Sequence, residues 1–470
     1  MDRADVRTGL ARLSPERRRR LRGVAAGLLL GAVAAMVLAQ PGPSLTLIAV
    51  ALSALFFVTQ PHWTVLVILV VSTLRLNPAR VGPLSTAELL AAVLALPLVL
   101  ELLRDRKVWV WHVPEMRLVL GIAAVSLVAT VWSLVRHPPP PLDALDQPWN
   151  ELFFFGQSLL FLLYFVHFIK TPRHLVYAVV VTLLMILAAS AEAAYSAEHT
   201  PGRGRAQTAY FGGFTGNENR LAHLCVWGTA LFWSLRYKAP RGWWRRMALG
   251  PVLALPVVAL MTGSRSGLLQ LMVLAGLILL EQRQWAPAQR ARACALVLTV
   301  GLVVLVAAPA AMVERASDFD VGGRTTADRL HAIEAGVSMI AENPVFGVGP
   351  GNFEWRYQIR TGQPMTAHNS YVHAIASGGP LLLLLYLALF YRIHRTLQAV
   401  ERRGPPAFVW LTTALRLNLI MLLVFSFFAT VWTSELFWLL IGLTIVLARI
   451  ASANPHPIAA APAPATVATG

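Results

Sequence analysis

Apolar runs of about 20 residues recur along most of this chain, and each is long enough to cross the hydrocarbon core of a bilayer as a helix. Backbone amides and carbonyls in lipid must be paired within their own segment, so these runs are expected to be α-helices. Only 13% of the 470 residues are charged, against about 25% in a soluble globular chain. The sequence therefore predicts an all-α protein built as a polytopic transmembrane helix bundle.

The apolar runs predict 12–14 membrane helices. They lie at 22–39, 44–59, 62–76, 85–103, 116–135, 151–169, 173–194, 219–235, 247–262, 265–281, 293–313, 371–391, 407–430 and 434–449. The runs 44–59 and 62–76 are short and separated by Gln60 and Pro61, so they could form one broken element or a re-entrant pair. With either 12 or 14 membrane helices, both termini lie on the same side of the membrane.

The basic residues predict the orientation in a bacterial inner membrane. Arg17 to Arg20 and Arg22 lie before the first run, which places the tail 1–21 in the cytoplasm. Three further basic clusters, at 236–246, 283–292 and 392–403, fall on the same side by the helix count. The net charge of +17 is thus explained by membrane topology, so membrane lipids are expected partners and nucleic-acid binding is not expected.

The predicted organisation has five parts. They are a basic cytoplasmic tail at 1–21, a transmembrane bundle at 22–313, a periplasmic loop at 314–370, C-terminal transmembrane helices at 371–450 and a disordered Ala/Pro tail at 451–470. The loop 314–370 is long and carries a helical pattern at 325–342, so we expect it to be structured and functional. The loop 136–150 contains Pro138 to Pro141 and is expected to be a stiff, extended connection.

Ionisable residues near membrane depth are costly, and three groups of them lie on the predicted periplasmic side. The first is Gly216-Asn-Glu-Asn-Arg220, at the start of a helix. Asn217 can cap that helix, whose free N–H groups favour an anion, and the Arg220 guanidinium suits phosphate oxygens. His223 lies one turn further on the same face. Alternatively, Arg220 reaches the membrane interface or pairs with Glu218.

The second group is the turn Thr262-Gly-Ser-Arg265-Ser-Gly between two apolar helices. Ser264 and Arg265 again offer donors at a helix start, on the side where positive residues are disfavoured. A plain hairpin turn with an arginine that binds a lipid headgroup is the alternative interpretation.

The third group closes the long loop. It contains Asn343-Pro-Val-Phe-Gly347-Val-Gly349 and then His368-Asn-Ser-Tyr371 at the entrance to a membrane helix. Glycines allow tight turns near a ligand, and a neutral imidazole can act as a general base. Taken alone, His368 would more often be a hydrogen-bonded structural residue.

Together these motifs resemble the O-antigen ligase and polymerase superfamily of membrane glycosyltransferases. The resemblance covers about residues 200–395 and rests on four features in order. They are Arg220-x-x-x-Leu224, the turn around Arg265, Asn343-Pro-x-x-Gly347-x-Gly349, and His368-Asn-x-Tyr371 with Gly379 at the family spacing. The resemblance implies a GT-C-like fold and an enzyme that needs no cofactor and no metal.

The resemblance also implies the substrates and the roles of the residues. The donor would be O-antigen linked to undecaprenyl diphosphate, and the acceptor a sugar hydroxyl of lipid A–core. Arg220 and Arg265 would bind the diphosphate, and His368 would activate the acceptor hydroxyl. Secondary binding candidates are Asn217, Asn219, Ser264, Arg324, Arg329, Asn369 and Tyr371. Glu435, in a short periplasmic turn, is an alternative base.

Three other functions remain open from the sequence. A polymerase of the same superfamily would share the chemistry and differ only in its acceptor. A protein O-oligosaccharyltransferase would modify Ser or Thr, although such proteins often carry an extra C-terminal periplasmic region. A transporter of lipid-linked glycan belongs to another class; it would need no base, and it commonly shows internal repeats, which this sequence lacks.

Overall fold

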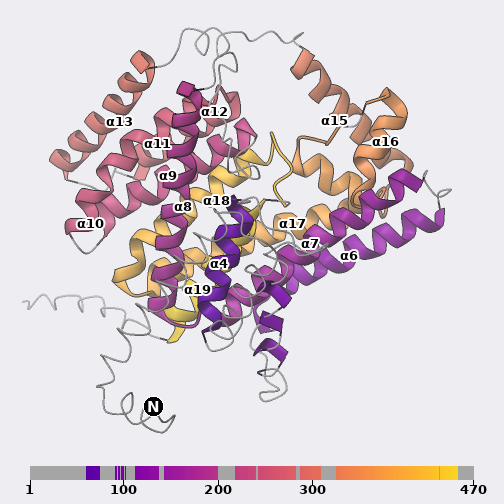
Figure 1. Cartoon of the computed structure of the whole chain (residues 1–470), viewed down its shortest axis with the longest axis horizontal. Coiled ribbons are helices and arrows are strands. Elements are labelled where there is room, and N and C mark those ends of the chain that lie inside the picture. Colours follow the sequence, from indigo (N-terminus) through magenta and orange to yellow (C-terminus); the bar gives the residue numbers. More distant parts are fainter. Residues whose placement is uncertain are drawn as a thin grey trace, which may run out of the picture.

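The computed structural model describes ten segments of the chain (Figure 1). They are 60–74, most of 90–101, 112–136, 142–199, 217–239, 242–281, 286–307, 324–363, 365–432 and 434–453. The predicted tail 1–21, the runs 22–39 and 44–59, and nearly all of the predicted tail 451–470 lie outside the described residues.

Every regular element in the described segments is a helix. The α-helices are α4 (Pro61–Leu74), α6 (Pro114–Arg136), α7 (Leu142–Phe168), α8 (Pro172–His199), α9 (Glu218–Lys238), α10 (Gly242–Met247), α11 (Leu249–Met261), α12 (Arg265–Glu281), α13 (Pro287–Ala307), α15 (Arg324–Glu342), α16 (Asn352–Thr361), α17 (Ser370–Arg403), α18 (Val409–Phe425) and α19 (Glu435–Ala453), with a short 3₁₀ turn η3 (Pro406–Phe408) before α18.

Seven helical stretches within these segments are long and apolar enough to cross a membrane. They are Pro114–Arg136, Glu151–Phe168, Pro172–Ser196, Gly242–Met261, Ser370–Arg403, Pro406–Phe425 and Glu435–Ala453. The all-α, multi-pass membrane fold predicted from the apolar runs is therefore confirmed.

One helix begins earlier than predicted, and one helix was not predicted. Residues 142–150, expected in an extended loop, form the first turns of α7, because the helix begins as soon as the proline run ends at Pro141. The helix predicted at 325–342 is present as α15, and α16 is a second helix in the long loop that periodicity did not reveal.

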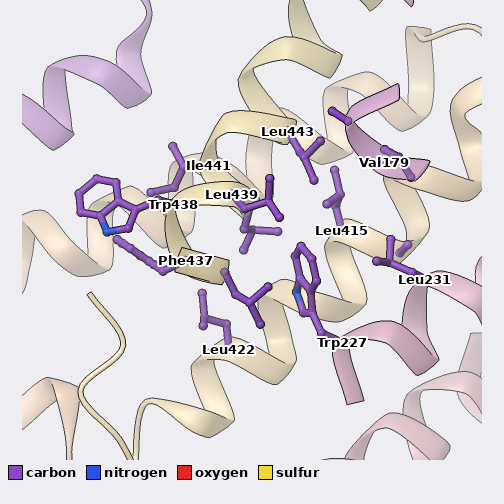
Figure 2. Close-up of a cluster of buried hydrophobic side chains, with 14 of the residues drawn as sticks. Val179, Trp227, Leu231, Leu415, Leu422, Phe437, Trp438, Leu439, Ile441 and Leu443 are labelled. Carbon is purple, nitrogen blue, oxygen red and sulfur yellow. The ribbon is translucent and has the colours of Figure 1, made fainter. Parts of the chain in front are cut away.

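Helix α9 lies at the centre of the bundle and is covered by α8, α11, α12 and α18. Every residue from 221 to 235 is buried. Figure 2 shows Trp227 and Leu231 of α9 packed with Leu415 and Leu422 of α18. Because protein rather than lipid surrounds α9, its sequence can carry histidine, serine and threonine among its apolar residues.

Helix α17 is broken in its first third, where a loop docks against it. Gly379 has a φ of 71° and is followed by Pro380, so the backbone leaves the helical path there. The freed carbonyl of Ala376 accepts from the Val348 N–H at 2.7 Å, and that of Ser377 accepts from the Gly349 N–H at 2.9 Å. The two carbonyls freed at the break are thus hydrogen-bonded by the protein itself, as non-helical backbone at membrane depth requires.

The glycines of the Asn343-Pro-x-x-Gly347-x-Gly349 motif make this docking possible. A Cβ at Gly347 would lie 2.3 Å from the Ala376 carbonyl oxygen, and one at Gly379 would lie 1.9 Å from the Val345 oxygen. Both glycines also have positive φ. The spacing from His368 to Gly379 therefore reflects a packing requirement between the long loop and α17.

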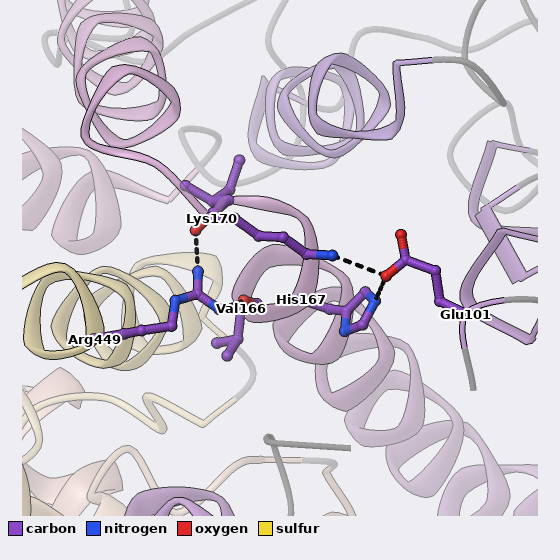
Figure 3. Close-up of polar contacts among 6 residues, drawn as sticks. Glu101, Val166, His167, Lys170 and Arg449 are labelled. Atoms are coloured by element: carbon purple, nitrogen blue, oxygen red, sulfur yellow. Dashed lines mark hydrogen bonds and ion pairs between the residues drawn. The ribbon is translucent and has the colours of Figure 1, made fainter. Parts of the chain in front are cut away.

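The carboxyl end of α7, predicted to face the cytoplasm, is held by polar contacts (Figure 3). Glu101 accepts from Lys170 at 2.8 Å and lies 2.6 Å from the His167 ring nitrogen. Arg449 of α19 donates to the Val166 carbonyl at 2.9 Å. These contacts tie α19 to the turn between α7 and α8.

Candidate functional site

Helix α9 begins with a side-chain cap, as its sequence predicts. The Asn217 side chain accepts from the N–H groups of Asn219 and Arg220, at 3.0 and 3.3 Å. Asn217 thereby satisfies two of the free donors at the helix start and places Arg220, partly buried, in the first turn.

The start of α12 lies against the start of α9. Ser264 donates to the Asn219 side-chain oxygen at 2.7 Å, and Ser266 donates to the same oxygen at 3.2 Å. Ser264 also accepts from the Gly267 N–H at 3.1 Å, which caps α12. A Cβ at Gly267 would lie 2.5 Å from the Ala222 Cβ, so only glycine permits this close crossing. Arg265 is the exposed first residue of α12.

His368 lies in the short non-helical segment before α17. Among the described residues it is the only one other than glycine with a positive φ, at 46°. The Asn369 side chain caps α17 by accepting from the N–H groups of Tyr371 and Val372, at 2.9 and 3.1 Å. Ser370 then fastens the segment by donating to the Ala429 carbonyl at 2.6 Å. A left-handed backbone at a bulky side chain is strained, and such strain is concentrated at functional sites.

Electrostatic interactions join these separate elements into one cluster. Burial, Arg329 and Arg220 together lower the pKa of His368 below its usual value of 6.5. Burial and Arg265 lower the pKa of Arg329, which lies in the second turn of α15. Arg220, Arg265, Arg329 and His368 are hereafter called the cationic cluster. Three helices and one loop segment supply its four members.

The cationic cluster has a defined chemical capability. Guanidinium groups at helix starts attract and orient an anion with several oxygens, such as a phosphate ester. Burial, together with these positive charges, lowers the pKa of the His368 imidazole and favours its neutral form, which has a lone pair able to accept a proton. The arrangement therefore combines an anion site with a candidate base.

The other residues singled out from the sequence occupy structural positions. Asn217 and Asn369 are helix caps, and Asn219 and Ser264 connect α9 to α12. The Tyr371 hydroxyl donates to the Leu423 carbonyl at 3.0 Å, across the α17–α18 contact. Arg324 begins α15, but its side chain lies outside the description; Glu435 begins α19. Their predicted roles in substrate binding or catalysis stay predictions.

A contact between a partly buried acid and a buried histidine near the start of α17 was not predicted. The Glu151 carboxylate lies 3.3 Å from the His373 ring nitrogen and accepts from the Trp432 indole N–H at 3.1 Å. Glu151, Pro350 and Trp432 also line a small pocket. The signal available in the sequence was an acid within the apolar run at 151–169.

Within the described segments, no three or more His, Cys, Asp or Glu side chains gather in a way that could hold a metal ion. The first turns of α9 and α12 carry the cations Arg220 and Arg265 and one acid, Glu218, and this excess of cations suits an anionic ligand.

Fold and site together define a multi-pass helical membrane protein with a cationic site at its helix starts. Residues 250–387 match the family model described as O-antigen ligase. This match supports a place for the chain in the O-antigen ligase/polymerase superfamily, so the resemblance seen in the motifs is confirmed. Members of the family are glycosyltransferase-like enzymes, which supports an enzymatic activity. No curated protein matches the chain.

The matched region contains Arg265, Arg329 and His368, whereas Arg220 lies before it. Arg220 joins the cationic cluster through its interaction with His368. The site thus extends beyond the part of the chain that the family model describes.

Proposed function

We propose that this protein is an O-antigen ligase. It transfers O-antigen polysaccharide from undecaprenyl diphosphate to a sugar hydroxyl of lipid A–core, on the periplasmic side of the bacterial inner membrane. The observation that carries this proposal is the cationic cluster. Arg220 and Arg329 lie within electrostatic reach of the His368 imidazole, and Arg265 lies within electrostatic reach of Arg329. The match of residues 250–387 to the O-antigen ligase family model supports the same proposal.

In the proposed reaction the bond between the anomeric carbon and the diphosphate oxygen breaks, and its electron pair leaves with the diphosphate. Negative charge grows on that oxygen, so the fixed guanidinium groups of Arg220 and Arg265 stabilise the transition state more than the ground state. The donor already carries the activating group, and no nucleotide is needed.

His368 acts as the general base in this proposal. The acceptor oxygen forms the new glycosidic bond while its proton moves to the imidazole, a contribution typically worth about 10²–10⁴-fold in rate. Direct displacement inverts the configuration at the anomeric carbon. The lowered pKa of His368 keeps the base in its neutral form at the pH of the periplasm.

Arg329 and Arg324 belong to α15, in the long loop between α13 and α17. We propose that they contact phosphate or acidic groups of the lipid A–core acceptor. This assignment places the donor near α9 and α12 and the acceptor near α15, with His368 between them.

The test is transfer by the purified protein. Undecaprenyl-diphosphate-linked O-antigen and rough lipopolysaccharide are mixed with the protein and a metal chelator, and the products are separated on a gel. A laddered lipopolysaccharide product, made by the wild type and lost in His368→Asn, supports a metal-independent ligase.

The other products separate the alternatives. Growth of the lipid-linked chain itself would make the protein a polymerase, and glycan on an added peptide rich in Ser and Thr would make it a protein O-oligosaccharyltransferase. Movement of intact donor across a proteoliposome membrane, without any new glycosidic bond, would make it a transporter and contradict the proposal.

A further inference from the structure

A buried polar network lies directly beneath the starts of α9 and α12. Gln270, fully buried in α12, donates its side-chain N–H to the Ser266 carbonyl at 3.1 Å. A carbonyl can only accept, so the side-chain oxygen of Gln270 must face the other way, toward His223 of α9. That oxygen lies 2.6 Å from the His223 Nδ1.

The orientation of Gln270 fixes the protonation of His223. Because the Gln270 oxygen is an acceptor, His223 Nδ1 carries the proton and donates it. The ring is fully buried and stacked on Phe425 of α18, with ring centroids 4.2 Å apart and planes 10° apart. In the described part of the chain, His223 Nε2 has no hydrogen-bond partner.

The network extends from Gln270 and His223 to the first turns of α9 and α12, which carry Arg220 and Arg265. Ser266 supplies the carbonyl that Gln270 binds, and its hydroxyl donates to Asn219. Asn219 immediately precedes Arg220, and Ser266 immediately follows Arg265. Asn219, His223, Ser264, Ser266 and Gln270 are called the α9–α12 polar bridge.

Burying the polar side chains of the bridge costs free energy, which suggests that the bridge serves to fix the relative position of α9 and α12. An apolar contact would hold two helices together without the risk of leaving a buried hydrogen-bond donor or acceptor unpaired. Directional hydrogen bonds, however, fix the register of two helices, whereas apolar packing tolerates small shifts. Here the register determines how far apart the residues at the two helix starts lie.

We propose that Gln270 is a positioning residue, which sets the spacing of Arg220 and Arg265 for a diphosphate through the α9–α12 polar bridge. This inference rests on the proposed function, because it takes the diphosphate of the donor as the ligand of both arginines. Gln270 acts through the helix starts and does not touch the substrate. A displacement of about 0.5–1 Å at such a site is enough to weaken binding and turnover.

The test compares Gln270→Met with Thr229→Val in otherwise wild-type protein in nanodiscs. Methionine keeps the length of the side chain and removes the two hydrogen bonds that Gln270 makes, to His223 and to the Ser266 carbonyl. Thr229 is a buried residue of α9, the helix that packs against α12, and its hydroxyl donates within α9 to the Cys225 carbonyl at 2.8 Å. Its replacement controls for the loss of a buried polar group away from the arginines.

The measurements are the Kd for undecaprenyl diphosphate without glycan, the kcat of transfer and the Tm. We expect Gln270→Met to weaken lipid binding and to lower kcat, each by about tenfold per folded molecule, while Thr229→Val changes neither. Gln270→Glu keeps the size and the acceptor toward His223, and we expect an intermediate effect. It also serves as the second variant if Gln270→Met does not fold.

A double variant tests the route of the effect. In an Arg265→Ala background the spacing no longer matters, so adding Gln270→Met should weaken lipid binding no further. Equal losses with and without Arg265, or wild-type Kd and kcat in Gln270→Met, would overturn the inference.

Failure of the proposed function gives a different result. If the wild type binds undecaprenyl diphosphate but transfers no glycan, the ligase proposal is wrong and the lipid affinities alone decide the role of Gln270. If the wild type does not bind this lipid, both proposals are wrong.

Discussion

The two halves of the cationic cluster are built in different ways. Arg220 and Arg265 extend from the first turns of α9 and α12, which are capped and joined by side-chain hydrogen bonds, and Arg329 extends from the second turn of α15. His368 instead lies outside any helix, with a left-handed backbone, in the segment between α16 and α17. One half is fixed by helix geometry, and the other is a strained residue held by its neighbours.

This difference matches the two chemical tasks proposed for the site. A bound diphosphate needs charges at a constant spacing, which rigid helix starts provide. A base must lie where the attacking hydroxyl arrives, and a loop residue can present its ring in a direction that a helix does not allow. The comparison therefore predicts that substitutions in the two halves have different consequences.

The largest effect is expected at His368. Removing the base should lower kcat by about 10²–10⁴-fold with little change in donor affinity. His368→Asn is the better variant than His368→Ala, because asparagine tolerates positive φ and so preserves the local backbone. Rates of transfer and the Kd for undecaprenyl diphosphate, measured on the same preparation, check this; an equal loss in both would indicate a structural role.

A somewhat smaller effect is expected at Arg265. Replacement by alanine removes a group that stabilises the leaving diphosphate, so kcat should fall by about 10²–10³-fold and donor binding should weaken as well. Arg265→Lys keeps the charge but loses the bidentate geometry and should recover only part of the activity. Full activity in the lysine variant would show that charge alone suffices at this position.

The third prediction concerns the docking of the long loop on α17 and not the chemistry of His368. Gly379→Ala would place a methyl group 1.9 Å from the Val345 oxygen at a residue with a φ of 71°, so the folded state should lose about 1–3 kcal/mol. Gly276→Ala in α12 is the control, since nothing lies within 4 Å of its Cβ. Thermal unfolding in detergent measures the Tm of both variants. The same Tm for Gly379→Ala and Gly276→Ala would contradict the proposed cause of the break in α17.

The smallest effect is a shift in pH dependence. Burial and the positive charges of Arg329 and Arg220 lower the pKa of His368, so transfer should fall as the pH drops through a value below 6.5. Arg329→Gln removes one of those charges, and the acid limb of kcat/KM should move upward toward 6.5. An unchanged acid limb would mean that another group titrates, or that Arg329 does not face His368 during turnover.

Much of the fold could be predicted because its causes are local. Membrane spans follow from apolar length, and the start of α12 at Arg265 and the α15 helix follow from turn and periodicity signals. The beginning of α7 was misplaced because a proline run marks where a helix cannot be, but does not show how soon one begins. The break in α17 depends on the docking of a loop that ends some 30 residues earlier, which no local pattern contains.

The site was predictable to a similar extent and for similar reasons. Arg220, Arg265 and His368 stand out because charge is rare in such a chain, whereas their approach to Arg329 is a consequence of tertiary packing. The link from Gln270 to His223 was not foreseen, since a glutamine in an apolar run carries no signal of its partner. The Glu151–His373 contact was missed for the same reason.

The central claim is that the two halves of the cationic cluster act on one reaction, and a double-mutant cycle tests it most directly. Single-turnover transfer is measured for the wild type, His368→Asn, Arg265→Ala and the double variant. Residues that serve one transition state are not additive, so the double variant should be little slower than the slower single variant. Fully additive losses would contradict a single site and would separate the arginines from His368.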